Sequence, residues 1–194
     1  MLKYVSIDIE SCGLDTDKHS ILEFGAVLDD LQNPLPIEEL SKFHCYFLPV
    51  NDGDFVGSPY ALSMHPIILR RIAEREKGYR YYSPLKFGSF FKQFLLKNGY
   101  EAEHDRVYIN VAGKNFGTFD LQVLNKQTDL SKHVKIRHRM LDPGAMFATK
   151  EDDTLPGLEE CLNRIGEAPV VSHTAIEDAI DVVKLIRYKM LGEI

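Results

Sequence analysis

Asp8 and Glu10 stand two residues apart in the segment KYVSIDIE (residues 3–10), where apolar and polar residues alternate strictly. Such alternation predicts a β-strand, and residues i and i+2 of a strand point to the same face, about 7 Å apart. Two carboxylates held side by side near a core repel each other unless a divalent cation lies between them. Hard oxygen ligands of this kind suit magnesium or manganese. A lone pair with this spacing is also common on solvent-exposed strands, so only further acids would indicate a metal site.

Two further acids lie near expected helix starts. Asp120 follows the stretch NFGTF, and Asp178 falls in the first turn of the last expected helix, five residues after His173. Taken singly, each acid is explained by its favourable interaction with the helix dipole, about 0.3–1 kcal/mol, and the histidine by an exposed loop. Only a pattern that links these residues to the D-x-E pair would indicate a shared site.

The motifs that carry these residues resemble those of the DEDDh branch of the DnaQ-like 3′-5′ exonuclease family, within the ribonuclease H-like superfamily. SIDIESCGLD resembles its first motif (D-x-E-[ST]-x-G-L), NFGTFD its second (N-x-x-x-F-D) and HTAIEDA its third (H-x-A-x-x-D-A). The three motifs follow family order over residues 5–181. The matched catalytic residues are Asp8, Glu10, Asp120, His173 and Asp178.

The resemblance implies a hydrolase with two magnesium or manganese ions per site, which releases 5′-mononucleotides from the 3′ end of a single strand. It implies that Asp8 bridges both ions and that Asp120 holds one of them. Glu10 and Asp178 would bind the other ion, beside the attacking water. His173, with an unperturbed pKa of about 6.5, is suited to take the proton from that water at neutral pH.

Five residues of the first two motifs are expected to contact substrate: Cys12, Gly13, Leu14, Asn115 and Phe119. Leu14 is either an apolar wedge beside the terminal base or a residue that packs within its turn. Cys12 stands where family members often have threonine, a departure that bears on substrate preference and not on the reaction.

The expected architecture is α/β, a ribonuclease H-like five-stranded mixed sheet with flanking helices, in a single exonuclease domain of residues 1–194. Strands are predicted over residues 3–10, 20–30, 42–50, 106–113 and 135–142. Helices are predicted from residue 66, and over 83–99, 115–127, 154–165 and 175–191. Asn115 is the expected N-cap of the third of these helices, and the pair Thr174 and Glu177 the expected capping box of the last.

The net charge of −6 looks unfavourable for a protein that binds nucleic acid, but the charge is unevenly distributed. Residues 60–97 carry eight basic and two acidic side chains, whereas residues 1–59 carry three basic and eleven acidic side chains. Two basic segments, residues 70–82 and 131–139, could contact phosphates, although a solvated helix face and a protected edge strand explain them equally well. The three cysteines form no C-x-x-C pair, so they indicate neither a disulfide framework nor a zinc site. Because no apolar run is long enough to span a bilayer, we expect a cytoplasmic protein.

The function that these features predict is metal-dependent 3′-5′ exonuclease activity on single-stranded DNA or RNA with a free 3′ end. Within this class, both a DNA exonuclease and an exoribonuclease that trims RNA ends or short oligoribonucleotides fit the sequence. A catalytically silent module that binds nucleic acid is the alternative from another class. An unrelated metal-binding phosphatase would account for the D-x-E pair but not for the H-x-A-x-x-D motif. Association as a homodimer or with a polymerase is compatible with all of these readings.

Overall fold

The structure is a computed structural model that describes residues 2–50, 53–168 and 174–192. Its strands are β1 (Lys3–Ser11), β2 (Ile21–Asp30), β3 (Lys42–Phe47), β4 (Tyr81–Tyr82), β5 (Ala102–Glu103), β6 (Arg106–Ala112) and β7 (Val134–Leu141). Its α-helices are α1 (Pro59–Met64), α2 (Pro66–Glu74), α3 (Pro84–Lys97), α4 (Asp120–Gln127), α5 (Leu130–His133), α6 (Pro143–Phe147), α7 (Leu158–Arg164) and α8 (Ala175–Leu191), and a 3-10 turn covers Ile37–Glu39. No helix in the described ranges combines the length and apolar character needed to cross a membrane.

One mixed sheet organises the chain, in the order β4-β3-β2-β1-β6-β5, with β7 also paired to β6. β1, β2 and β3 form an antiparallel meander, whereas β6 runs parallel to β1 and β7 runs parallel to β6. The α/β class and the mixed sheet with flanking helices are therefore confirmed. All five expected strands are present, and the two-residue strands β4 and β5 bring the sheet to seven.

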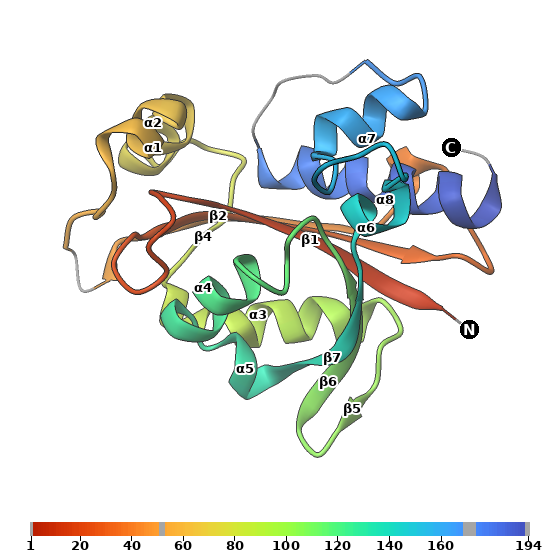
Figure 1. Cartoon of the computed structure of the whole chain (residues 1–194). Coiled ribbons are helices and arrows are strands. Elements are labelled where there is room, and N and C mark those ends of the chain that lie inside the picture. The colour runs from red at the N-terminus through yellow and green to blue at the C-terminus, as the bar shows by residue number, and fades with distance from the viewer. Residues whose placement is uncertain (1, 51–52, 169–173, 193–194) are drawn as a thin grey trace.

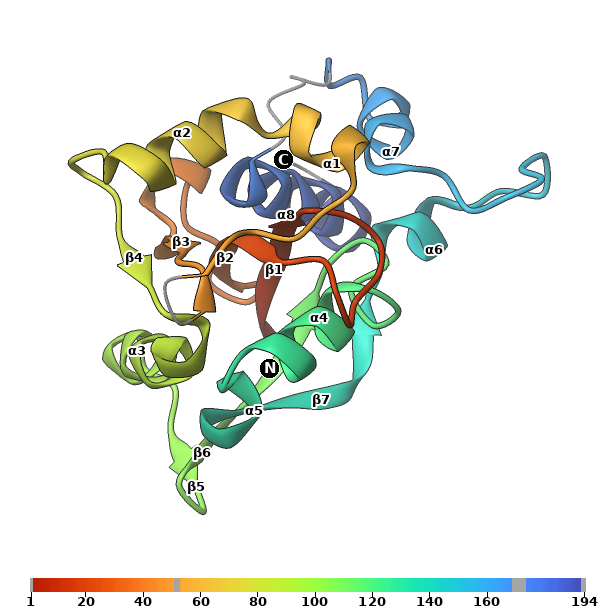
Figure 2. The same cartoon turned by 90° about the vertical axis from the view of Figure 1, so that its left-hand side faces the viewer.

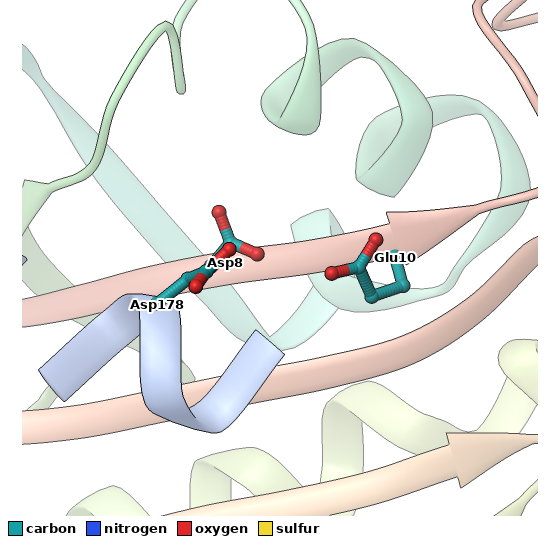
Figure 3. A group of neighbouring side chains, drawn as sticks. All are labelled: Asp8, Glu10 and Asp178. Atoms are coloured by element: carbon teal, nitrogen blue, oxygen red, sulfur yellow. The ribbon is translucent and has the colours of Figure 1, made fainter. Parts of the chain in front are cut away.

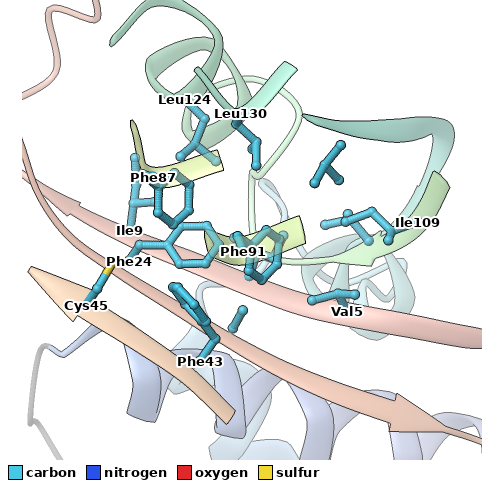
Figure 4. Close-up of a cluster of buried hydrophobic side chains, with 14 of the residues drawn as sticks. Val5, Ile9, Phe24, Phe43, Cys45, Phe87, Phe91, Ile109, Leu124 and Leu130 are labelled. Carbon is cyan, nitrogen blue, oxygen red and sulfur yellow. The ribbon is translucent and has the colours of Figure 1, made fainter. Parts of the chain in front are cut away.

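Helices cover both faces of the sheet, with α3, α4 and α5 on one side and α6, α7 and α8 on the other (Figure 1). The first layer encloses an aromatic core in which Phe24 and Phe43 of the sheet meet Phe87 and Phe91 of α3 (Figure 4). The ring centroids of Phe24 and Phe87 are 4.7 Å apart at a steep angle, the edge-to-face arrangement that aromatic pairs favour. This core fixes β2, and β2 is the neighbour of β1.

The second layer sets α8 directly on β1 and β2. A Cβ atom at Gly25 would lie 2.3 Å from the backbone of Ala175, so only glycine allows the helix start to approach β2 this closely. At the other end of the helix, Arg187 donates to both carboxylate oxygens of buried Asp29, at 2.6 and 3.1 Å. Asp29 also accepts the hydroxyl of Tyr4. The first turn of α8 is therefore held against the middle of the sheet.

Two helix starts and one helix cap differ from the sequence prediction. Asn115 does not cap a helix, because its backbone has φ of 54°, and residues 115–119 form a turn before α4 begins at Asp120. α7 begins at Leu158 instead of residue 154. Thr174 is the N-cap of α8 as expected, but its hydroxyl lies 2.6 Å from Oε2 of Glu177 and does not accept a backbone N–H.

Candidate active site

Three carboxylates meet where the first turn of α8 crosses β1. Asp8 and Glu10 project from the same face of β1, and Asp178 reaches them from the helix (Figure 3). One oxygen from each can be chosen so that all three lie within 4.8 Å of one another, and each residue is partly buried. The expected side-by-side arrangement of Asp8 and Glu10 follows from the period of the strand.

Asp120 is the fourth expected carboxylate and lies next to this cluster. It is the first residue of α4 and is only 5% exposed. Its charge is among the groups that raise the pKa of both Asp8 and Glu10, which places it within electrostatic reach of the two. Phe119, the residue before it, packs partly buried against the aromatic core and so holds this helix start in place.

The carboxylates sit where ionisation is unfavourable without a counter-ion. Burial, followed by the charges of Asp120 and Asp178, raises the pKa of Asp8 well above its usual range. Burial and the charge of Asp178 raise the pKa of Glu10 to about 9. Burial also raises the pKa of Asp120 to about 7, partly offset by hydrogen bonds from the backbone of Asp120 itself and of Ile9. A group of acids in this state is prepared to bind positive charge.

Sequence reasoning missed a fifth acid, Glu23 of β2. It is fully buried and is the cross-strand partner of Glu10. Its Oε1 lies 2.5 Å from Nε2 of His44, and its Oε2 accepts the backbone N–H of Ala175 at 3.2 Å. The available signal was the lone charge of Glu23 within the apolar run ILEFGAVL. A charged side chain in a buried strand is a signal because such side chains are almost never fully buried unless they are paired.

His65 is a second residue that the motifs did not identify. It lies between α1 and α2, is 8% exposed, and places Nε2 3.5 Å from Oε2 of Glu10. The expected general base, His173, lies outside the described residues. The residue after it, Thr174, is the N-cap of α8.

The expected substrate contacts fall into two groups. Leu14 is 84% exposed, so its side chain contributes little to packing within its turn, and its role as a wedge stays a prediction. Cys12 is fully buried against Leu22 and Ile68, and its backbone N–H and carbonyl already bond to Ser20 and Ser58. Its side chain therefore packs the strand end and does not reach the surface.

Two other expected contacts shape the turns around the acids. Gly13 has φ of 145°, and a Cβ atom there would lie 2.4 Å from the ring of His19, so the turn after β1 requires glycine. Asn115 is exposed and donates its backbone N–H to Asp142 at 3.0 Å, which ties the turn before α4 to the end of β7. Both residues hold backbone segments beside the carboxylates.

A cavity of about 430 Å³ lies between α2 and the start of α8. His65 and His44, the partners of Glu10 and Glu23, both line it. The cavity also contains Tyr46, Arg71, Tyr79 and Thr174 among its lining residues. It therefore presents aromatic rings and one guanidinium, and the two histidines connect it to Glu10 and Glu23.

The basic segment 70–82 contributes to this cavity wall with much of its charge already engaged. Arg71 donates to the hydroxyl of Tyr46 at 2.9 Å and lies 4.6 Å from the ring centroid of Tyr79. Arg75 lies 5.6 Å from the ring centroid of Tyr81. These contacts hold Arg71 and Arg75 against tyrosine side chains of the same domain.

Comparison with known proteins gives structural matches only. No family model matches the chain, and no curated protein matches it in sequence. Among solved structures, Escherichia coli exonuclease I with a dT13 oligonucleotide matches at a TM-score of 0.64 and 15% identity, over 99% of this chain and 41% of that one. The structure described as suggesting how exonuclease I achieves processivity matches at a TM-score of 0.66 and 14% identity, over 99% of this chain and 42% of that one. The complex of exonuclease I with SSB-Ct matches at a TM-score of 0.59 and 15% identity, over 98% of this chain and 42% of that one.

These matches establish the fold. The chain has the mixed sheet with flanking helices that was predicted from the sequence, and it shares this fold with exonuclease I. The chain spans about two-fifths of the length of the solved structures it matches.

Proposed function

We propose that this protein is a divalent-metal-dependent 3′-5′ exonuclease that acts on single-stranded nucleic acid. The observation that carries the proposal is the meeting of Asp8, Glu10 and Asp178 at one point, with buried Asp120 beside them. Similarity in fold to exonuclease I, one structure of which contains a dT13 oligonucleotide, supports single-stranded DNA as the first substrate to test.

The donor set fits magnesium or manganese. All four side chains offer carboxylate oxygens, the ligands that hard divalent cations prefer, and four negative charges nearly cancel two such ions. Burial and the neighbouring acids raise the pKa values of Asp8 and Glu10, and burial raises that of Asp120, so bound positive charge would stabilise their ionised forms. Two bound ions would supply a more acidic water and charge neutralisation on the phosphoryl group.

The protein's own residues would hold the reacting groups in place. Asp8 would contribute to both ion positions, with Glu10 and Asp178 on the side of the attacking water and Asp120 on the other. His173 would take the proton from that water, since its ordinary pKa lies near neutrality.

The cavity beside Glu10 would receive the terminal nucleotide. Its volume of about 430 Å³ falls within the roughly 300–1,000 Å³ of typical ligand sites. The rings of Tyr46 and Tyr79 offer stacking surface, and the Arg71 guanidinium offers a cation for a phosphate. Leu14, exposed on the turn after β1, would separate the terminal base from the next one.

The experiment that tests this function compares DNA and RNA oligonucleotides of the same sequence, labelled at the 5′ end, with magnesium, manganese or EDTA. We expect stepwise shortening from the 3′ end and 5′-mononucleotide products only when a divalent ion is present. A circular single strand is the control and should stay intact. Full activity in EDTA, or cleavage of the circle, would overturn the proposal, and binding without hydrolysis would indicate the silent module.

A further inference from the structure

The edge strand β7 carries a basic bulge. Ile109 of β6 pairs with Ile136, and Val111 pairs with Met140, so β7 advances four residues while β6 advances two. The two extra residues fall in the stretch Arg137–Arg139, where all three side chains are exposed. Among the described residues β7 pairs only with β6, and Figures 1 and 2 show it at the outer edge of the sheet. Bulges of this kind re-aim side chains away from the regular sheet.

A groove of about 720 Å³ lies against this bulge. Its lining residues are Tyr108, Asn110, Lys135, Ile136, Arg137, His138 and Arg139, and we call it the β7 groove. The chain has no acid between Asp129 and Asp142. In the described part of the chain, no carboxylate lies within 4.0 Å of the charged nitrogens of Lys135, Arg137 or Arg139. Within the described ranges, the groove therefore presents three cations that form no ion pair with a carboxylate.

The groove combines this charge with an aromatic ring. The guanidinium of Arg137 lies 5.8 Å from the ring centroid of Tyr108, which is partly buried in β6. Phosphates accept from arginine and lysine, and nucleobases stack on tyrosine or on a guanidinium plane, so this mixture fits a single nucleic-acid strand. An acidic peptide would use the charges and offer no base to stack on the ring.

The position of the groove relative to the carboxylates suits a strand whose end is in the site. Ala112 of β6 pairs with Ser6 of β1 on one side and with Leu141 of β7 on the other. Asp8 lies two residues beyond Ser6, and Arg139 two residues before Leu141. With about 3.3 Å per residue and about 4.8 Å between strands, the two residues are roughly 15–20 Å apart. A few extended nucleotides bridge this separation.

We propose that the β7 groove binds the sugar-phosphate backbone of the single strand several nucleotides 5′ of the bond that is cut. This inference rests on the proposed exonuclease function and adds a second, remote contact to it. The competing explanation is that the basic residues only keep the exposed edge from pairing with another chain. That explanation predicts no effect on oligonucleotide affinity.

The test measures binding in EDTA, where no hydrolysis occurs, by fluorescence anisotropy of thymidine oligonucleotides of about four and about twenty residues, lengths that bracket a single binding site. The variant carries Arg137→Ala and Arg139→Ala. The matched control carries Lys86→Ala and Lys97→Ala, which remove two exposed charges from α3 on the other side of the sheet. Thermal unfolding of each variant confirms that it is folded.

We expect the groove variant to lose at least about fivefold in affinity for the longer oligonucleotide, while the control stays near wild type. The slope of log affinity against log salt should become shallower by about 1.4, because each phosphate contact on a single strand contributes about 0.7. Tyr108→Ala should also weaken binding of the longer strand, and Tyr108→Phe should restore it, because stacking needs the ring and not the hydroxyl.

The outcomes separate this inference from the proposed function. If oligonucleotides are hydrolysed but the groove variant binds the longer strand with wild-type affinity and salt slope, the groove assignment is wrong and the exonuclease proposal stands. If the groove variant instead loses affinity for poly-glutamate and keeps wild-type affinity for the oligonucleotide, the groove binds an acidic protein partner. That result would overturn the assignment. If the wild type neither binds nor cuts any oligonucleotide, the proposed function fails, and the groove assignment fails with it.

Discussion

Glu23 lies directly across from Glu10 on the neighbouring strand and accepts the backbone N–H of Ala175, the first residue of α8, at 3.2 Å. One buried carboxylate thus connects the strand behind the site to the helix that carries Asp178. Because an anion at a helix N-terminus interacts favourably with the helix dipole, Glu23 also stabilises the position of that helix start.

Replacing Glu23 should loosen this connection. Glu23→Ala removes the acceptor for Ala175 and the partner of His44, and we expect it to lower the free energy of unfolding by about 1–3 kcal/mol, the cost of leaving buried polar groups without partners. Glu23→Gln keeps a carbonyl oxygen and should lose less. Denaturant unfolding measures both, with the exposed Glu101→Ala as the control. A Glu23→Ala protein as stable as the control would refute this role.

The stability of the metal-free protein should fall as the pH rises. Burial raises the pKa of Glu10 to about 9 and that of Asp120 to about 7, so the folded state favours their protonated forms. Groups with a raised folded-state pKa contribute stability below their unfolded pKa, and this contribution is lost as the pH rises through the folded value. The window therefore runs from about pH 4 to about pH 9.

Thermal unfolding in EDTA across this range measures the effect, and magnesium or manganese should raise the melting temperature most at its alkaline end. The double variant Asp120→Asn and Glu10→Gln is the reference, because it lacks both titrating groups and should show a flatter profile. If the melting temperature in EDTA falls as steeply with pH in the variant as in the wild type, other residues cause the pH dependence.

His173→Ala should separate catalysis from binding. If His173 is the general base, its loss should reduce kcat by roughly 10²- to 10⁴-fold, while metal and oligonucleotide affinity stay nearly unchanged. The acid limb of the pH-rate profile should also be altered or lost. Measurement at saturating metal is required, because acids that release metal at low pH produce a similar limb. A variant with wild-type kcat and an unchanged profile would make His173 a bystander.

Leu14→Ala should impair substrate use without affecting the fold. The side chain is 84% exposed, so its removal should change stability by less than about 0.5 kcal/mol. If Leu14 is the wedge beside the terminal base, KM for oligonucleotides should rise several-fold. Leu155→Ala, at a site 60% exposed and in a different part of the chain, is the control. Equal KM values in both variants would contradict the wedge.

The parts of this protein that were predictable from sequence are those encoded by local periodicity. Alternation located β1 and placed Asp8 and Glu10 on one face, whereas β2 was located by its run of aliphatic and aromatic residues and is buried almost throughout. The predicted start of α4 at residue 115 was wrong, because Asn115 adopts a left-handed conformation that its residue type permits but does not require.

The residues that escaped prediction depend on contacts between distant segments. Glu23 meets His44 from 21 positions away and Ala175 from 152 positions away, so no short window reveals its role. His65 reaches Glu10 only because α1 and α2 fold back over the strand end. The β7 bulge likewise appears only once the pairing of β6 with β7 is known.

The central claim is that the carboxylates of β1, α4 and α8 form a divalent-metal site, and calorimetric titration with manganese tests it most directly. The account predicts that the wild type binds two ions and that Asp8→Asn abolishes or severely weakens binding, because Asp8 would contribute to both positions. Asp153→Asn, which removes an exposed carboxylate elsewhere, should bind manganese as the wild type does. A wild type that binds no manganese, or an Asp8→Asn protein that binds it as the wild type does, would contradict the account.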